Sequence, residues 1–218
     1  MSKQVKTKKE KTITNTSFGY IGTVTISIKD NKNNTIITKK HHNTGSINIF
    51  KYISDCLAGE YKTAQNSQPT KIGLLSVKGN DLPSSIRAVL NNGEIALVDS
   101  KLELATSGLI SAYGKITSDM GDESYGSTML TPYITTLHFR IPYSFITKNR
   151  INGVMLFPTK ATVGNYTLAN SWSAYYLFTT GSGDNEEWSV LELSNQQNYN
   201  LIIDWELSIS NTTTEAIS

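Results

Sequence analysis

The chain has 218 residues, of which 38% are hydrophobic and 17% are charged, a balance that excludes a disordered protein and allows a substantial core. Its formal net charge of +2 is unevenly spread: residues 1–11 carry five lysines against one glutamate, which is +4, and the remainder therefore carries about −2. With a single cysteine, Cys56, no intrachain disulfide is possible.

Residues 1–16 are polar and basic and show no hydrophobic periodicity, so we expect a flexible N-terminal arm. No apolar run follows its lysines, and no stretch approaches the roughly 20 apolar residues of a membrane-spanning helix. We therefore expect a protein made in the cytoplasm, with no secretory signal and no membrane contact. We expect no contact with nucleic acid outside this arm. The lysines of the arm are candidate assembly contacts: Lys3, Lys6, Lys8, Lys9 and Lys11.

An alternating pattern begins at Tyr20, with Val24, Ile26 and Ile28 on one face and threonine or serine on the other. A cluster of turn residues at 30–34 follows, and residues 35–40 return as a second strand. The pattern predicts a β-hairpin.

Residues 46–58 are the only strong helix signal, because apolar residues recur there at helical spacing: Ile49, Phe50, Ile53, Cys56 and Leu57. Thr44 or Ser46 can cap the N-terminus, and Gly59 can take the left-handed position after the last turn. We expect this apolar face, including Cys56, to be buried against a sheet.

The middle of the chain predicts few regular elements. We expect a polar loop over residues 60–70, a strand over 71–77 and an ordered loop over 79–93 that has room for one helical turn. Residues 94–104 and 109–117 are predicted to form an antiparallel pair. Residues 118–131 are rich in Gly, Asp and Ser and predict a long mobile loop, with Asp119, Asp122 and Glu123 as candidate assembly contacts.

Strand patterns fill the rest of the sequence, at residues 133–145, 151–157, 173–178, 187–193 and 200–210. The last alternates cleanly, with Leu201, Ile203 and Trp205 on one face and Asp204 and Glu206 on the other. The predicted fold is mainly β, an antiparallel β-sandwich with one amphipathic helix packed on it, and residues 17–218 form a single domain.

No catalytic constellation stands out in the sequence. His41 and His42 are adjacent, so in an extended segment they point to opposite faces and cannot easily share a metal ion. Residues 121–126 read G-x-x-S-x-G, which is not the nucleophile elbow of hydrolases. We predict a protein that is not an enzyme and holds no metal or cofactor.

Aromatic residues gather in the C-terminal half, and aromatic faces can stack on sugars. Trp172 and Tyr175 lie near a predicted loop and are the candidate residues of a glycan-binding site. A glycan-binding receptor-recognition module is therefore an alternative function.

Several short stretches resemble small structural proteins of tailed bacteriophage virions, including those of crAss-like phages. The resemblance is carried by the N-terminal hairpin and by six short stretches: residues 40–45, Phe50, residues 57–59, residues 69–72, residues 139–142 and residues 204–206. It implies a non-enzymatic β-sandwich in the virion that forms a cyclic homo-oligomer at the neck or tail, next to the portal or along the tail, and contacts other neck, tail or capsid proteins. The alternative place in the virion is that of a head fibre or a capsid decoration. It brings no catalytic residues.

Overall fold

A computed structural model of the chain describes residues 13–30, 32–118, 133–162, 172–191 and 199–215. The strands are β1 (Ile13–Lys29), β2 (Thr35–Gly45), β3 (Pro69–Val77), β4 (Leu102–Leu104), β5 (Ile110–Ser111), β6 (Gly114–Ser118), β7 (Tyr133–Pro142), β8 (Gly153–Pro158), β9 (Ala174–Leu177), β10 (Thr179–Thr180), β11 (Glu187–Trp188) and β12 (Asn200–Glu215). The helices are α1 (Ile47–Leu57), α2 (Tyr61–Ser67), α3 (Pro83–Asn92) and α4 (Ile95–Lys101), with short 3-10 turns at Tyr143–Phe145 and Gly183–Asn185.

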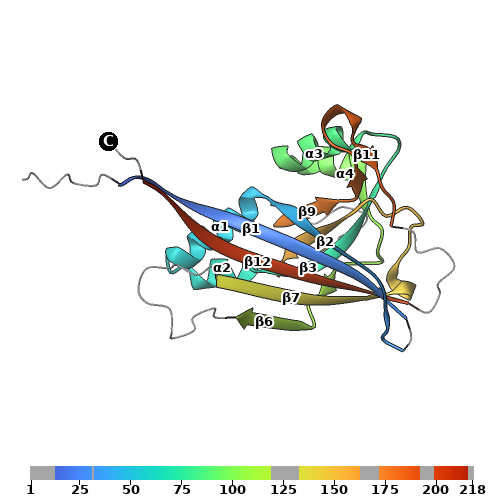
Figure 1. The fold of residues 1–218 in the computed structure, drawn as a ribbon, viewed down its shortest axis with the longest axis horizontal. Helices are drawn as coiled ribbons and strands as arrows, with labels where there is room; N and C mark the ends of the chain where they lie inside the picture. Colours follow the sequence, from blue (N-terminus) through green and yellow to red (C-terminus); the bar gives the residue numbers. More distant parts are fainter. Residues whose placement is uncertain (1–12, 31, 119–132, 163–171, 192–198, 216–218) are drawn as a thin grey trace, which may run out of the picture.

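Ten of these strands form one curled antiparallel sheet in the order β4-β3-β8-β9-β2-β1-β12-β7-β6, with β5 beside β3. The long strands β1, β12 and β7 run side by side through the centre of the molecule (Figure 1). We call β2, β1, β12, β7 and β6 the front half of the sheet, and β4, β3, β8 and β9 the back half. The halves are joined where β2 meets β9, through only two residue pairs, Thr44 with Tyr175 and Gly45 with Ala174.

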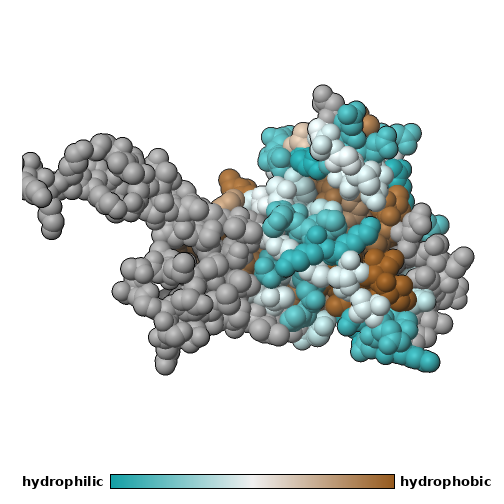
Figure 2. Space-filling model, in the orientation of Figure 1, coloured by the Kyte–Doolittle hydropathy of each residue, from teal (hydrophilic) through white to brown (hydrophobic). Residues whose placement is uncertain are grey.

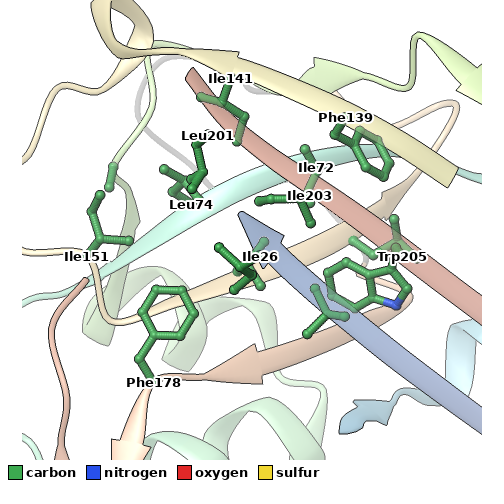
Figure 3. Packing of buried hydrophobic residues seen from close by; sticks show 14 of the residues in the cluster. Ile26, Ile72, Leu74, Phe139, Ile141, Ile151, Phe178, Leu201, Ile203 and Trp205 are labelled. Atoms are coloured by element: carbon green, nitrogen blue, oxygen red, sulfur yellow. The ribbon is translucent and has the colours of Figure 1, made fainter. Parts of the chain in front are cut away.

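A first core lies between the two halves of the sheet, because every second residue of each strand points inward. The front half contributes residues such as Ile26, Phe139 and Trp205, and the back half contributes residues such as Ile72 and Leu74 (Figure 3). The fold therefore has the two facing β layers of a sandwich, although the layers belong to one continuous sheet.

A second core lies on the opposite face of the back half, under α3 and α4. Here Leu75 of β3 and Met155 of β8 pack with Ile86 and Leu90 of α3 and Val98 of α4. All six residues of β8 are buried, since this strand has a core on both faces. The helices α3 and α4 lie together beyond the back half and make a third layer (Figure 1).

The predicted mainly-β class is confirmed, as are the β-hairpin and the helix over residues 46–58. Ser46 caps α1 by accepting a hydrogen bond from the backbone N–H of Asn48, and Gly59 follows the helix with φ of +75°. The final strand is also confirmed and extends further than predicted, from Asn200 to Glu215.

The prediction of a single helix is wrong, because the described residues contain four. Residues 79–93 contain the ten-residue α3, and residues 60–70 contain α2. The predicted strand pair formed by residues 94–104 and 109–117 is also wrong. Residues 95–101 form α4, and the short β4 that follows pairs with β3.

Residues 13–16, which were predicted to be part of the N-terminal arm, belong to β1 and are paired with β12. Residues 1–12 and 119–132 lie outside the described residues.

Candidate functional site

The outer edge of β2 is the most unusual feature of the sheet. Strand β2 pairs with β1 along its length, but on its other side it meets β9 only at Thr44 and Gly45. Among the residues that the structure describes, no strand pairs with the outer edge from Thr35 to His42. In an antiparallel ladder alternate residues turn their N–H and C=O groups outward, so this segment offers unpaired backbone groups to another chain.

A cavity, which we call the edge groove, lies beside this edge where β2 diverges from β9. It has a volume of about 280 Å³. Its lining comes from β1, β2 and the segment from β9 to residue 191: Ile26, Ile28, Ile37, Lys39, His41, Tyr176, Phe178, Thr179, Thr180, Ser189, Val190 and Leu191. Figure 2 shows hydrophobic surface beside the polar turn that joins β1 to β2.

The side chains along β2 are open to solvent on both faces. Ile36 and Ile37 point to opposite faces and are 45% and 42% exposed. Apolar residues on both faces of an exposed edge strand are typical of a segment that another chain covers.

His41 forms one end of the edge groove and stacks on Tyr176, with ring centroids 4.5 Å apart and an angle of 15° between the planes. Partial burial lowers the pKa of His41 below its ordinary value, and the nearby charge of Lys39 lowers this pKa further. Burial also raises the pKa of Tyr176. Both rings are therefore neutral at pH 7, which suits stacking.

The β1–β2 hairpin is basic. Between residues 29 and 42 the sequence holds four lysines and one aspartate, a formal charge of +3. Among the described residues, neither Lys39 nor Lys40 has an ion-pair partner. The one acid, Asp30, is engaged in the turn, where it accepts hydrogen bonds from the N–H groups of Lys32 and Asn34.

A second exposed apolar surface lies on α1. Hydrogen bonds fix the start of this helix to the two residues that precede β9. The Ser46 N–H donates to the Ser173 carbonyl at 2.9 Å, and Asn48 Nδ2 donates to the Trp172 carbonyl at 2.9 Å. Ser46 Oγ also donates to the Trp172 carbonyl. The orientation of α1 on the sheet is therefore well determined.

The apolar residues of α1 are nevertheless mostly in solvent. Only Ile49 is buried; Ile47 and Leu57 are 78% and 81% exposed. We call Ile47, Phe50 and Leu57 the α1 face; Phe50 and Leu57 are seven residues apart and share one side of the helix. Cys56 is exposed, so its predicted burial is wrong, and α1 packs against α2 more than against the sheet.

The structure brings His138 and Asp204 together on the polar outer face of the front half, with 2.7 Å between His138 Nδ1 and Asp204 Oδ1. Tyr113 lies beside them, 6.0 Å from the imidazole between ring centroids. Within the described part of the chain, no group of three His, Cys, Asp or Glu residues could hold a metal ion. We take the pair as a cross-strand contact that stabilises the adjacent strands β7 and β12.

The residues predicted to stack on a glycan lie inside the protein. Trp172 and Tyr175 are 2% and 1% exposed and belong to the second core, and the Tyr175 hydroxyl donates to Asn91 Oδ1 at 2.7 Å. Their ring faces are covered, so the structure gives no support to glycan stacking at these two residues. The other candidate contacts fall outside the described residues: Lys3, Lys6, Lys8, Lys9, Lys11, Asp119, Asp122 and Glu123.

The edge groove was not predicted from the sequence, because its residues come from separate elements that converge only in the fold. The adjacent pair His41-His42 was the one available signal. As expected, the two side chains take opposite faces of β2, with His41 in the groove and His42 exposed.

No protein-family model, curated protein or solved structure matches this chain. In the part of the chain that the structure describes, no helix has the length and apolar character needed to cross a membrane.

Proposed function

We propose that this chain is a non-enzymatic structural protein that assembles with further copies of itself through the α1 face, as a cyclic oligomer in the neck or tail of a bacteriophage virion. The observation that supports assembly is the exposure of Ile47 and Leu57, at 78% and 81%, on a helix whose start is hydrogen-bonded to the sheet. The placement in a virion is supported by the sequence resemblance alone.

The physical argument starts from the cost of exposing apolar side chains. Burying one large aliphatic side chain contributes about 1.5–3 kcal/mol, so two of them are a substantial part of a subunit contact. Because α1 is already ordered, little conformational entropy is lost when a second copy covers it. A closed ring further requires that the α1 face contact a different surface on the next copy.

Light scattering of the purified protein at several concentrations tests this function. We expect a discrete oligomer for the natural chain and a smaller species for the double variant Ile47→Ser/Leu57→Ser. The matched control is Leu82→Ser, which removes another large apolar side chain, 66% exposed, at the start of α3 and should leave the mass unchanged.

A monomer at every concentration would contradict self-assembly and favour a decoration or receptor-binding role. An oligomer unaffected by the double variant would contradict the part assigned to α1. Circular dichroism of the double variant should match that of the natural chain, since both substituted side chains are in solvent.

A further inference from the structure

We propose that the outer edge of β2 binds an extended acidic segment of an unlike partner protein, which adds to the sheet as a new strand and covers the edge groove. This inference uses a different surface from the α1 face and holds whether or not the chain assembles through that helix.

The backbone supplies the first part of the argument. The outer edge from Thr35 to His42 is unpaired among the described residues, and at Thr44 and Gly45 the neighbouring position is already filled by β9. An incoming strand can therefore pair with β2 along its open length until β9 stops it. Backbone hydrogen bonds to a sheet edge supply affinity in this mode of recognition, and the side chains that meet pockets supply specificity.

The side chains of β2 specify the pattern of the added strand. Ile37, Lys39 and His41 point into the edge groove, whereas Lys40 points to the opposite face. An added strand would place one acidic residue opposite Lys39, another opposite Lys40, and an apolar residue opposite Ile37, above the aliphatic base of the groove.

Charge argues against a second copy of β2 as the occupant. If β2 paired with β2 of a second copy, Lys39 and Lys40 of one copy would lie close to Lys39 and Lys40 of the other. Like charges at close range are destabilising. Lysines on an edge strand are a common device against such edge-to-edge pairing. The same lysines have no acidic partner in the described chain, so an acidic segment would complement them.

The test uses a labelled synthetic peptide, Thr-Val-Thr-Val-Glu-Glu-Thr-Val-Thr-Val, and measures its binding by fluorescence anisotropy. Two matched peptides accompany it: one with Lys-Lys in place of Glu-Glu, and one with alternate backbone nitrogens methylated so that it cannot pair with a strand. The protein variants are Lys39→Glu/Lys40→Glu and, as a control, Lys62→Glu on the exposed surface of α2.

We expect the acidic peptide to bind the natural chain about tenfold more tightly than the lysine peptide, and the methylated peptide not to bind. The double variant should reverse the preference between the two charged peptides, and Lys62→Glu should leave it unchanged. Amide hydrogen exchange should slow in residues 35–42 when the acidic peptide is present.

Absence of acidic-peptide binding would overturn the proposal. The proposal would also be overturned if the Lys39→Glu/Lys40→Glu variant kept the peptide preference of the natural chain. Slower hydrogen exchange only in residues outside β2 would overturn it as well. Protection of residues 35–42 that rises with protein concentration alone would identify a second copy as the occupant and would also overturn it.

Discussion

The carboxylate of Glu186 has a pKa well below its ordinary value. Arg87 of α3 binds it with both guanidinium Nη atoms, at 2.6 Å and 2.8 Å, and Thr179 Oγ1 donates to it at 2.7 Å. The hydrogen bonds from Arg87 are the main cause that lowers the pKa of Glu186 from 4.5 to about 2. This contact ties the third layer to the β10–β11 hairpin at the edge groove.

The low pKa of Glu186 predicts how stability depends on pH. As the pH falls from 4.5, the unfolded chain takes up a proton at Glu186 before the folded chain does, so stability is lost progressively down to a pH of about 2. We expect Glu186→Gln to be less stable than the natural chain at pH 7 and to show a weaker loss of unfolding free energy over this interval, as measured by urea titration.

Glu187→Gln is the matched control, because Glu187 is the exposed neighbour of Glu186, whereas the ion pair of Arg87 is with Glu186. Its pH profile should follow that of the natural chain. Parallel profiles for Glu186→Gln and the natural chain would show that the Arg87 contact does not stabilise the fold.

At the scale of the element, α1 depends on the cap that Ser46 provides. Ser46→Ala removes the acceptor for the Asn48 N–H and the donor to the Trp172 carbonyl, and should cost about 1 kcal/mol of unfolding free energy. Hydrogen exchange should become faster in the first turn of α1. Ser54→Ala changes an exposed serine of the same helix, and it should neither lower the unfolding free energy nor speed hydrogen exchange in the first turn. Equal effects in both variants would mean that the cap does not hold the helix.

Strands with one polar face were predictable from their own residues. In β12 the alternation of Leu201, Ile203 and Trp205 with Asp204 and Glu206 reflects a strand with one face in the first core and one in solvent. The same reasoning gave the β1–β2 hairpin, because the outer face of β1 is rich in threonine and serine.

The helices of the third layer were missed, although α3 carries local signals for a helix. Pro83 occupies its first turn, and Gly93 follows its end with φ of +72°. Its apolar residues Ile86, Val89 and Leu90 also have helical spacing. The proline and glycine were interpreted as loop signals, because no second core was anticipated against which such a short helix could be buried.

The candidate site was less predictable than the fold. The edge groove exists because β2 leaves β9 after two residue pairs, and that divergence depends on how the whole sheet curls. The lysines of β2 are compatible with an edge strand, but they do not define the length over which that edge is uncovered. Likewise, the spacing of Phe50, Cys56 and Leu57 predicted a buried helix face, because spacing alone cannot tell which other surface covers it.

At the scale of the whole molecule, the back half of the sheet is shared by both cores, which predicts that the protein unfolds as one unit. Val154 of β8 belongs to the first core and Met155 to the second, so unfolding of β8 would disrupt both cores at once. Leu90→Ala, deep in the second core at 1% exposure, should destabilise the chain by about 2–5 kcal/mol. Leu82→Ala, on the exposed start of the same helix, should change stability by less than about 0.5 kcal/mol.

Fluorotryptophan NMR during urea unfolding can follow the two cores separately without further substitutions. Trp205 reports on the first core and Trp172 on the second. If the layers are coupled through the back half, Leu90→Ala will lower the unfolding midpoint of both signals equally. A midpoint that falls for Trp172 and stays fixed for Trp205 would mean that α3 and α4 unfold from an intact sandwich, and that the third layer is a separate unit added to it.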